Sequence, residues 1–209
     1  YMSSNTYLNI SKTLSYSRAN GPGARAVIWV QGCTIGCRGC YSQSTHPHRK
    51  VRVVDPIELA KWVCSIDGIE GVTISGGEPF EQSEAIAKFI ISVKKNRPEL
   101  SFFLFTGYEA DYLQQSTNKS IKTILGIIDM LSSGPFVAEL YESDLLWRGS
   151  SNQQLSYLSA RYSPEDEKEW SLTSPIEEVF MHNHGFEYTG FKGRNGPIFN
   201  HLKKLKLDI

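Results

Sequence analysis

The feature that most constrains the fold is a repeated alternation between short apolar segments and longer amphipathic ones. A continuous apolar run such as residues 26–30 is typical of a strand buried on both faces of a sheet, and residues 71–75 and 101–105 predict two further strands. Segments with helical spacing of apolar residues follow them, at 55–66, 82–96 and about 119–129. This alternation predicts an α/β fold with mainly parallel strands.

Further elements complete the predicted core. Residues 6–16 alternate well enough for an opening strand, and a fourth parallel strand is expected at about 134–140. Asp55 and Pro56 have the residue types of a helix N-cap and first helical position, so we expect the first helix to begin there.

Functional sites of such folds form at the carboxyl ends of the strands. Three glycine-bearing loops follow the predicted strands, namely the cysteine loop 31–41, Gly76–Pro79 and Thr106–Tyr108. Because parallel strands end at the same edge of a sheet, we expect these loops to lie together.

The first of these loops holds three of the four cysteines. Cys33, Cys37 and Cys40 have the spacing C-x3-C-x2-C, and so short a loop can turn three thiolates toward one metal centre. Thiolates select zinc, copper(I) or iron–sulfur clusters. Structural zinc and electron-carrying clusters usually have four protein ligands, so three cysteines leave one corner of a cubane cluster open for chemistry.

Other interpretations of the cysteines stay open at this point. A zinc site could be completed by His46 or His48, although zinc sites favour paired C-x2-C spacings. Cys64 falls on the apolar pattern of the first predicted helix, so we interpret it as a small buried hydrophobe rather than a fourth ligand. A disulfide framework is disfavoured because the cysteines crowd into one loop of a large chain.

The balance of charges and the length of the apolar runs limit which partners and which location we expect. The 209 residues include 22 Lys and Arg and 22 Asp and Glu, and this balance argues against nucleic acid or an anionic membrane chosen by bulk charge. The apolar runs are far shorter than the roughly 20 residues of a membrane span, and no export signal is visible. We expect a cytoplasmic protein, because free thiolates survive in a reducing compartment.

The pattern changes after residue 140. We expect residues 1–155 to form the core and 156–209 to form a C-terminal extension packed on or beside it. Residues 163–174 predict an acidic loop or a short solvated helix, and 176–191 predict a β-hairpin. His182 and His184 flank its turn, and we interpret them as polar turn residues.

The loop Gly76–Pro79 is suited to bind a zwitterion. Its two glycines let the backbone approach a ligand closely, Glu78 could take an ammonium group, and Pro79 fixes the turn. Alone this is a weak signal, since a plain strand-to-helix loop can have the same residues. Because it follows the cysteine loop by one helix and one strand, it describes an open cluster corner beside a pocket for an amino-acid-like group.

With these motifs in this order, the sequence resembles the radical S-adenosylmethionine (SAM) superfamily, and within it the activating enzymes of anaerobic ribonucleotide reductases. The resemblance covers roughly residues 20–155. The matching segments are Gly21–Gly23 with Arg25, Gly32–Tyr41, Ser44–Thr45, Ser75–Pro79, Thr106–Tyr108, Asp129–Phe136 and Trp147–Gln153.

The resemblance implies a [4Fe-4S] cluster held by Cys33, Cys37 and Cys40, with SAM bound to the open iron. It also implies a partial (β/α)6-type barrel that is open on one side, with the C-terminal hairpin as an extension. Its implied SAM contacts are Gly76, Gly77, Glu78 and Pro79 near the amino group, Thr106 along the methionine, Tyr41 near the adenine, and Arg148, Ser150, Ser151 and Asn152 near the carboxylate or ribose. For Arg148, a surface salt bridge is an equal alternative.

The implied activity is reductive cleavage of SAM to methionine and a 5′-deoxyadenosyl radical, with an electron from a flavodoxin- or ferredoxin-like donor. In the activating enzymes this radical takes a hydrogen atom from a glycine of a partner glycyl-radical enzyme. One alternative is a radical SAM enzyme that modifies a peptide, nucleotide or small molecule directly, and another is a non-catalytic zinc- or cluster-binding protein. Two departures from the family are a chain that continues for over fifty residues after Gln153, and Glu78 where the family often has Asp.

Overall fold

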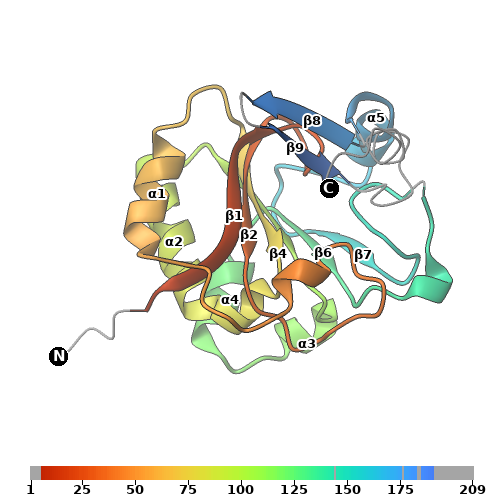
Figure 1. The fold of residues 1–209 in the computed structure, drawn as a ribbon, viewed down its shortest axis with the longest axis horizontal. Helices are drawn as coiled ribbons and strands as arrows, with labels where there is room; N and C mark the ends of the chain where they lie inside the picture. Colours follow the sequence, from red (N-terminus) through yellow and green to blue (C-terminus); the bar gives the residue numbers. More distant parts are fainter. Residues whose placement is uncertain (1–5, 144, 176, 183–184, 191–209) are drawn as a thin grey trace.

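The computed structural model describes residues 6–143, 145–175, 177–182 and 185–190. Its centre is a seven-stranded sheet with the order β3-β1-β2-β4-β5-β6-β7 (Figure 1). The strands are β1 (Leu8–Ser17), β2 (Arg25–Val30), β3 (Arg52–Val54), β4 (Gly71–Gly76), β5 (Ser101–Phe105), β6 (Met130–Ser133) and β7 (Gln154–Tyr157). A separate hairpin consists of β8 (Glu177–His182) and β9 (Gly185–Gly190).

The four central strands are parallel. β2 pairs with β4, β4 with β5, and β5 with β6 in parallel register, whereas β1, β3 and β7 pair antiparallel on the two sides. The prediction of an α/β fold with a mainly parallel sheet is confirmed. The division into six barrel units stays a prediction.

Helices cover one face of this sheet. α1 (Pro56–Cys64), α2 (Ser83–Asn96) and α4 (Lys119–Leu125) lie along it, with the short α3 (Ala110–Gln114) toward its lower end in Figure 1. α1 begins as predicted, because the Asp55 carboxylate accepts a hydrogen bond from the N–H of Ile57 at 2.7 Å. None of the helices in the described part of the chain is long and apolar enough to cross a membrane.

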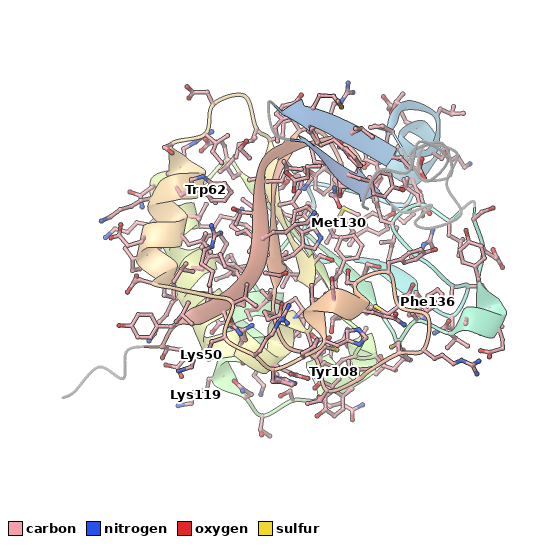
Figure 2. All side chains as sticks on the ribbon, viewed as in Figure 1. Lys50, Trp62, Tyr108, Lys119, Met130 and Phe136 are labelled. Carbon is pink, nitrogen blue, oxygen red and sulfur yellow. The ribbon has the colours of Figure 1, made fainter. Side chains whose placement is uncertain are left out.

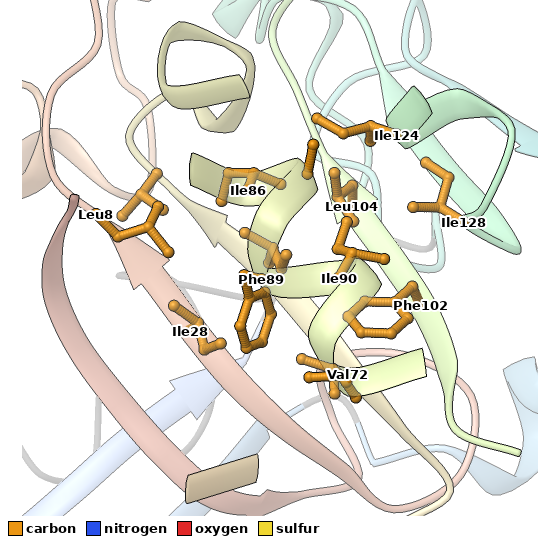
Figure 3. Packing of buried hydrophobic residues seen from close by; sticks show 14 of the residues in the cluster. Leu8, Ile28, Val72, Ile86, Phe89, Ile90, Phe102, Leu104, Ile124 and Ile128 are labelled. Atoms are coloured by element: carbon orange, nitrogen blue, oxygen red, sulfur yellow. The ribbon is translucent and has the colours of Figure 1, made fainter. Parts of the chain in front are cut away.

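Alternating side chains of the central strands fill cores on both faces of the sheet. Phe102 and Leu104 of β5 face the helices, where Phe89 of α2 packs against them in the main core (Figure 3). Phe103, between them in sequence, belongs to a second core with Met130 on the opposite face. A strand that is buried on both faces needs apolar residues throughout, which explains the unbroken apolar runs.

The C-terminal part covers that opposite face. Phe180 of β8 packs against Leu14, Val27 and Trp29, and Trp170 of α5 (Asp166–Thr173) packs against the core around Phe103. The predicted short helix and hairpin are therefore confirmed, although residues 176, 183–184 and 191 lie outside the described residues.

A carboxylate also joins the hairpin to the end of β1. Glu178 accepts hydrogen bonds from the N–H groups of Arg18 at 2.9 Å and Ala19 at 3.0 Å. Thr189 on the other hairpin strand accepts from the side-chain amide of Asn20 at 2.9 Å. The hairpin is therefore attached to the core by polar contacts as well as by apolar packing.

The fourth parallel strand was predicted wrongly at 134–140. It is β6, which ends at Ser133. Gly134 has a φ of +107° and Pro135 has no N–H to donate, so strand pairing stops there. Residues 138–140 instead form the 3-10 helix η3 (Ala138–Leu140). The short strands β3 and β7 were not predicted, and β7 spans the proposed domain boundary at residue 155, which itself stays a prediction.

One buried cation connects three central strands at their amino-terminal ends. Arg25 is fully buried, and its guanidinium donates to the hydroxyl of Thr73 at 2.8 Å and the carbonyl oxygen of Val72 at 2.9 Å. It also donates to the hydroxyl of Ser101 at 2.8 Å and the carbonyl of Pro22 at 2.9 Å. Burial lowers the pKa of Arg25, and these neutral acceptors compensate part of the cost of burying its charge.

Candidate functional site

A pocket of about 130 Å³ lies at the carboxyl ends of the central strands. All three cysteines of the loop line it, together with the turn after β4 and the loop after β5. The three loops that were expected to meet therefore do so. In Figure 2, Tyr108, which follows β5, lies at the lower end of the molecule, and Phe136, which lines the pocket, lies above it on the right.

The cysteine loop presents three free thiols that fit an iron–sulfur cluster. The N–H of Ser42 donates to the Sγ of Cys40 at 3.4 Å, and the N–H groups of Ile35 and Gly36 donate to Cys33. Burial raises the pKa of the Cys33 and Cys40 thiols, and these donors oppose it by favouring the thiolate. Amide donors to cluster sulfurs are one of the ways in which proteins stabilise such sites.

The other candidate ligands, His46, His48 and Cys64, differ in their placement. Across the described residues, no three His, Cys, Asp or Glu side chains are grouped to hold one metal ion. His46 lines the pocket, whereas His48 faces Glu81, with 3.6 Å between its Nε2 and the Oε2 of Glu81. Cys64 packs, partly buried, against the main core on α1, as we interpreted it.

The turn after β4 is in backbone contact with the cysteine loop. The N–H of Gly77 donates to the carbonyl of Val30 and that of Glu78 to the carbonyl of Gly32, both at 2.8 Å. A Cβ on Gly77 would overlap the Gly32 carbonyl, and Gly76 has a φ of +99°. Glycine is required at both positions because no side chain fits between the two backbones.

Glu78 connects this turn to the loop after β5. It is 1% exposed, and its Oε1 accepts from the N–H of Phe80 and the hydroxyl of Thr106, each at 2.9 Å. Its Oε2 accepts from the N–H of Gly107 at 2.9 Å. Burial raises the pKa of Glu78 to about 7, although these donors favour the charged form. Glu78 and Thr106 both line the pocket, as predicted.

A second carboxylate holds the cysteine loop in place. The Oε1 of Glu81, in the 3-10 helix η2 (Pro79–Gln82), accepts from the N–H of Thr34 at 2.7 Å and also from its hydroxyl. Thr34 directly follows Cys33, so this contact restrains the backbone beside the first cysteine. Glu81 was not predicted from the sequence, because an acidic residue near a helix start is common for reasons unrelated to a site.

Tyr41 lies at the edge of the pocket against Phe136. The ring centroids are 5.5 Å apart and the ring planes meet at 54°. Gly149 lies close to both rings, since a Cβ there would come within 3.0 Å of each. Tyr41 is therefore positioned to pack against a flat ligand, and its predicted contact with adenine stays a prediction.

The residues predicted after position 147 are only partly at the pocket. Arg148 lines it, but its guanidinium is ion-paired with Glu167 of α5. Both its predicted role near SAM and the alternative of a salt bridge are therefore compatible with its placement.

The neighbouring residues stabilise the loop itself. The Ser150 hydroxyl accepts from the N–H of Val137 at 3.2 Å, and the Asn152 amide donates to the carbonyl of Pro135 at 2.8 Å. The N–H of Ser151 donates to the carbonyl of Leu140 at 2.9 Å. The structure does not bring Ser150, Ser151 or Asn152 to the pocket wall.

Several pocket residues were not singled out from the sequence as site residues. Gln153 holds the wall together, accepting from the N–H of Gly149 at 2.7 Å and donating to the carbonyl of Gly134 at 2.8 Å. Trp147 has a φ of +52°, a conformation that non-glycine residues rarely adopt. The other lining residues of this kind are Ile35, Ser42, Ser75, Phe105, Ser132 and Phe136.

Fold and site together define the class. A three-cysteine loop beside a pocket at the carboxyl ends of parallel strands is the arrangement of a radical SAM enzyme, which uses a 4Fe-4S cluster and SAM. The family described as "4Fe-4S single cluster domain" matches residues 19–156. Curated relatives agree, and this chain belongs to the family of anaerobic ribonucleoside-triphosphate reductase-activating proteins.

Three relatives with that name illustrate the similarity. The protein of Haemophilus influenzae is 32% identical over 140 residues, which cover 64% of this chain and 88% of the relative. The Escherichia coli K12 protein is 32% identical over 148 residues, covering 66% and 92%. The protein of phage T4 is 31% identical over 152 residues, covering 71% and 93%.

Proposed function

We propose that this protein activates a glycyl-radical enzyme, an anaerobic ribonucleotide reductase, by removing a hydrogen atom from one of its glycines. The observation that carries this proposal is the three-cysteine loop on the wall of the pocket, in a chain that belongs to the activating-protein family. The relatives act on an anaerobic ribonucleoside-triphosphate reductase by name. The proposal includes a flavodoxin- or ferredoxin-like electron donor and a cytoplasmic location, where thiolates stay reduced.

The bound cofactors would supply the radical chemistry, and the chain would supply their positions. Cys33, Cys37 and Cys40 would hold the cluster, and the turn after β4 would receive the amino-acid end of SAM. Glu78 lies at the base of that turn and can balance a positive charge there. Tyr41 and Phe136 can exclude water from the side of the pocket where their rings meet.

The test is whether this protein generates a glycyl radical on the reductase. The cluster-loaded protein, SAM and a reductant are mixed anaerobically with the reductase, and the reductase is examined by electron paramagnetic resonance. We expect a glycyl radical, and deuterium in 5′-deoxyadenosine when the reductase carries α-deuterated glycine. Deuterium uptake only from a peptide or small molecule, with no radical on the reductase, would favour the direct modifier instead.

Glu78 predicts a pH dependence of SAM binding. A cationic amino group bound beside its carboxylate favours the charged form, so it lowers a pKa that is about 7 in the free protein. Below that pH, binding must release the carboxyl proton. The affinity for SAM should therefore rise with pH up to about 7, by at most about tenfold per pH unit, and gain nothing more from Glu78 above it.

Calorimetric titration of the cluster-loaded protein with SAM, from about pH 6 to about pH 8, measures this. Glu78→Gln is the matched control, because the amide keeps an acceptor for the N–H of Phe80 but does not titrate. The ionisation of SAM itself affects both proteins equally, so the difference between them isolates Glu78. Identical pH profiles for the two proteins would contradict the prediction.

A further inference from the structure

The charges of this neutral chain are strongly separated along the sequence. Seven of the 22 Lys and Arg fall within residues 1–54, and none of the 22 Asp and Glu does. The same segment contains the cysteine loop and the chain that directly follows it. The loop that would hold the cluster is therefore embedded in the basic part of the protein.

Three of these cations are exposed and close together in sequence, and they are here called the basic edge: Arg49, Lys50 and Arg52. In the described part of the chain, none of them forms an ion pair, whereas six other Lys and Arg do. Arg52 donates only to the hydroxyl of Thr13, at 3.0 Å. Cations without local counterions keep their long-range attraction for an acidic partner.

The basic edge is joined to the cysteine loop by backbone contacts. The N–H of Cys33 donates to the carbonyl of His46 at 3.0 Å, and the N–H of Gly32 donates to the carbonyl of Thr45 at 2.7 Å. The Gln31 amide donates to the carbonyl of Pro47 at 2.6 Å. The chain then passes directly into the exposed residues 49–52, so a protein bound there would lie beside a cluster ligand.

The composition of this edge also suits protein binding. Val51 and Val53 alternate with its cations and are 46% and 48% exposed. Val53 lies in β3, an outer strand of the sheet, and Val51 directly precedes that strand. Arginine and apolar groups together are typical of protein interfaces.

The basic edge lies away from the aromatic side of the pocket, which Tyr41 and Phe136 form. In Figure 2, Lys50 lies at the lower left of the molecule and Phe136 lies on the right. A protein on the basic edge therefore leaves the side around Phe136 and Tyr41 free for the substrate.

We propose that the basic edge docks an acidic one-electron carrier protein of the flavodoxin or ferredoxin type, so that its redox centre lies against the cysteine loop. This rests on the proposed function, because each SAM cleavage consumes one electron. The reduced carrier would lose one electron, and the cluster held by Cys33, Cys37 and Cys40 would pass it to SAM, whose C–S bond would break to give methionine and a 5′-deoxyadenosyl radical. Charge complementarity would steer the carrier to this edge and away from the more acidic remainder of the chain.

The first test is binding alone. Oxidised acidic flavodoxin is titrated into the cluster-loaded protein by calorimetry at low and high salt. Arg49→Glu with Lys50→Glu is expected to weaken binding by about tenfold or more and to reduce its salt dependence. The control is Lys95→Glu with Lys168→Glu, which changes the net charge equally at exposed helical positions and should leave most of the affinity. Equal weakening in both double variants would overturn the proposal.

The second test is electron delivery. With reduced flavodoxin, the Arg49 and Lys50 double variant should form 5′-deoxyadenosine at least several-fold more slowly than the control. With photoreduced deazaflavin, a small reductant that needs no docking, both should match the unmodified protein. An equal loss of 5′-deoxyadenosine formation with both reductants would overturn the proposal. So would a double variant that binds flavodoxin normally but no longer binds the reductase. If the unmodified protein forms no 5′-deoxyadenosine with deazaflavin, that result counts against the proposed function. The binding titration does not depend on SAM cleavage, so it still tests the docking of flavodoxin.

Discussion

Replacing Cys37 with Ala is expected to abolish SAM cleavage while leaving the fold intact. Cys37 is one of the three thiols on the pocket wall, and two cysteines cannot hold a site-differentiated cluster in place of three. The cysteine loop contributes no residue to the main core, so little packing is lost. The measurements are iron content after anaerobic reconstitution, 5′-deoxyadenosine formation, and the far-ultraviolet circular dichroism spectrum with its thermal midpoint.

Cys64→Ala is the matched control for this experiment. Cys64 is the only cysteine outside the loop, and it packs against the main core on α1. The change should cost roughly 1 kcal/mol of stability through lost packing and leave iron content and turnover unchanged. Normal turnover in Cys37→Ala, or loss of iron in Cys64→Ala, would contradict the assignment of the cluster ligands.

Replacing Arg25 with Met is expected to destabilise the protein without removing its chemistry. The change leaves the carbonyl oxygens of Pro22 and Val72 and the Ser101 hydroxyl without their buried donor. Each buried acceptor that is left without its donor costs about 1–3 kcal/mol. A chain of this size loses roughly 2–4 °C in Tm per kcal/mol. Urea unfolding and thermal scans measure both quantities.

The control is Arg18→Met, because the Arg18 side chain is exposed and its hydrogen bonds to Glu178 come from the backbone. That change should shift the unfolding free energy by no more than about 0.5 kcal/mol. At a temperature where Arg25→Met is folded, its turnover per loaded cluster should equal that of the unmodified protein. A Tm of Arg25→Met close to that of Arg18→Met would show that the buried network is not stabilising.

The sequence was most informative where both faces of an element are buried. The apolar run 101–105 coincides with β5, and 26–30 lies within one residue of β2. Burial on both faces removes the polar alternation that makes strand assignment ambiguous elsewhere. The meeting of the three loops was also predictable, because it depends only on parallel strands ending at one edge.

The remaining site residues could not be predicted because their roles depend on contacts that are distant in sequence. Glu81 reaches Thr34, which is 47 positions away, and Arg148 meets Glu167 of a helix outside the matched family segment. β7 is four residues long and partly exposed, so its sequence shows no clear alternation of polar and apolar residues. The predicted strand at 134–140 failed for a local reason, since Gly134 and Pro135 end the pairing that Met130 begins.

The attachment of the hairpin bears on where this protein can be cut. The family match stops at residue 156, inside β7, yet Phe180 covers the apolar side of β1 and β2 and Glu178 occupies the amides at the end of β1. A fragment ending at residue 156 would lack Phe180 and expose Leu14, Val27 and Trp29 to water. The segment that matches the family is therefore shorter than the segment that keeps these apolar side chains buried, which extends to the hairpin.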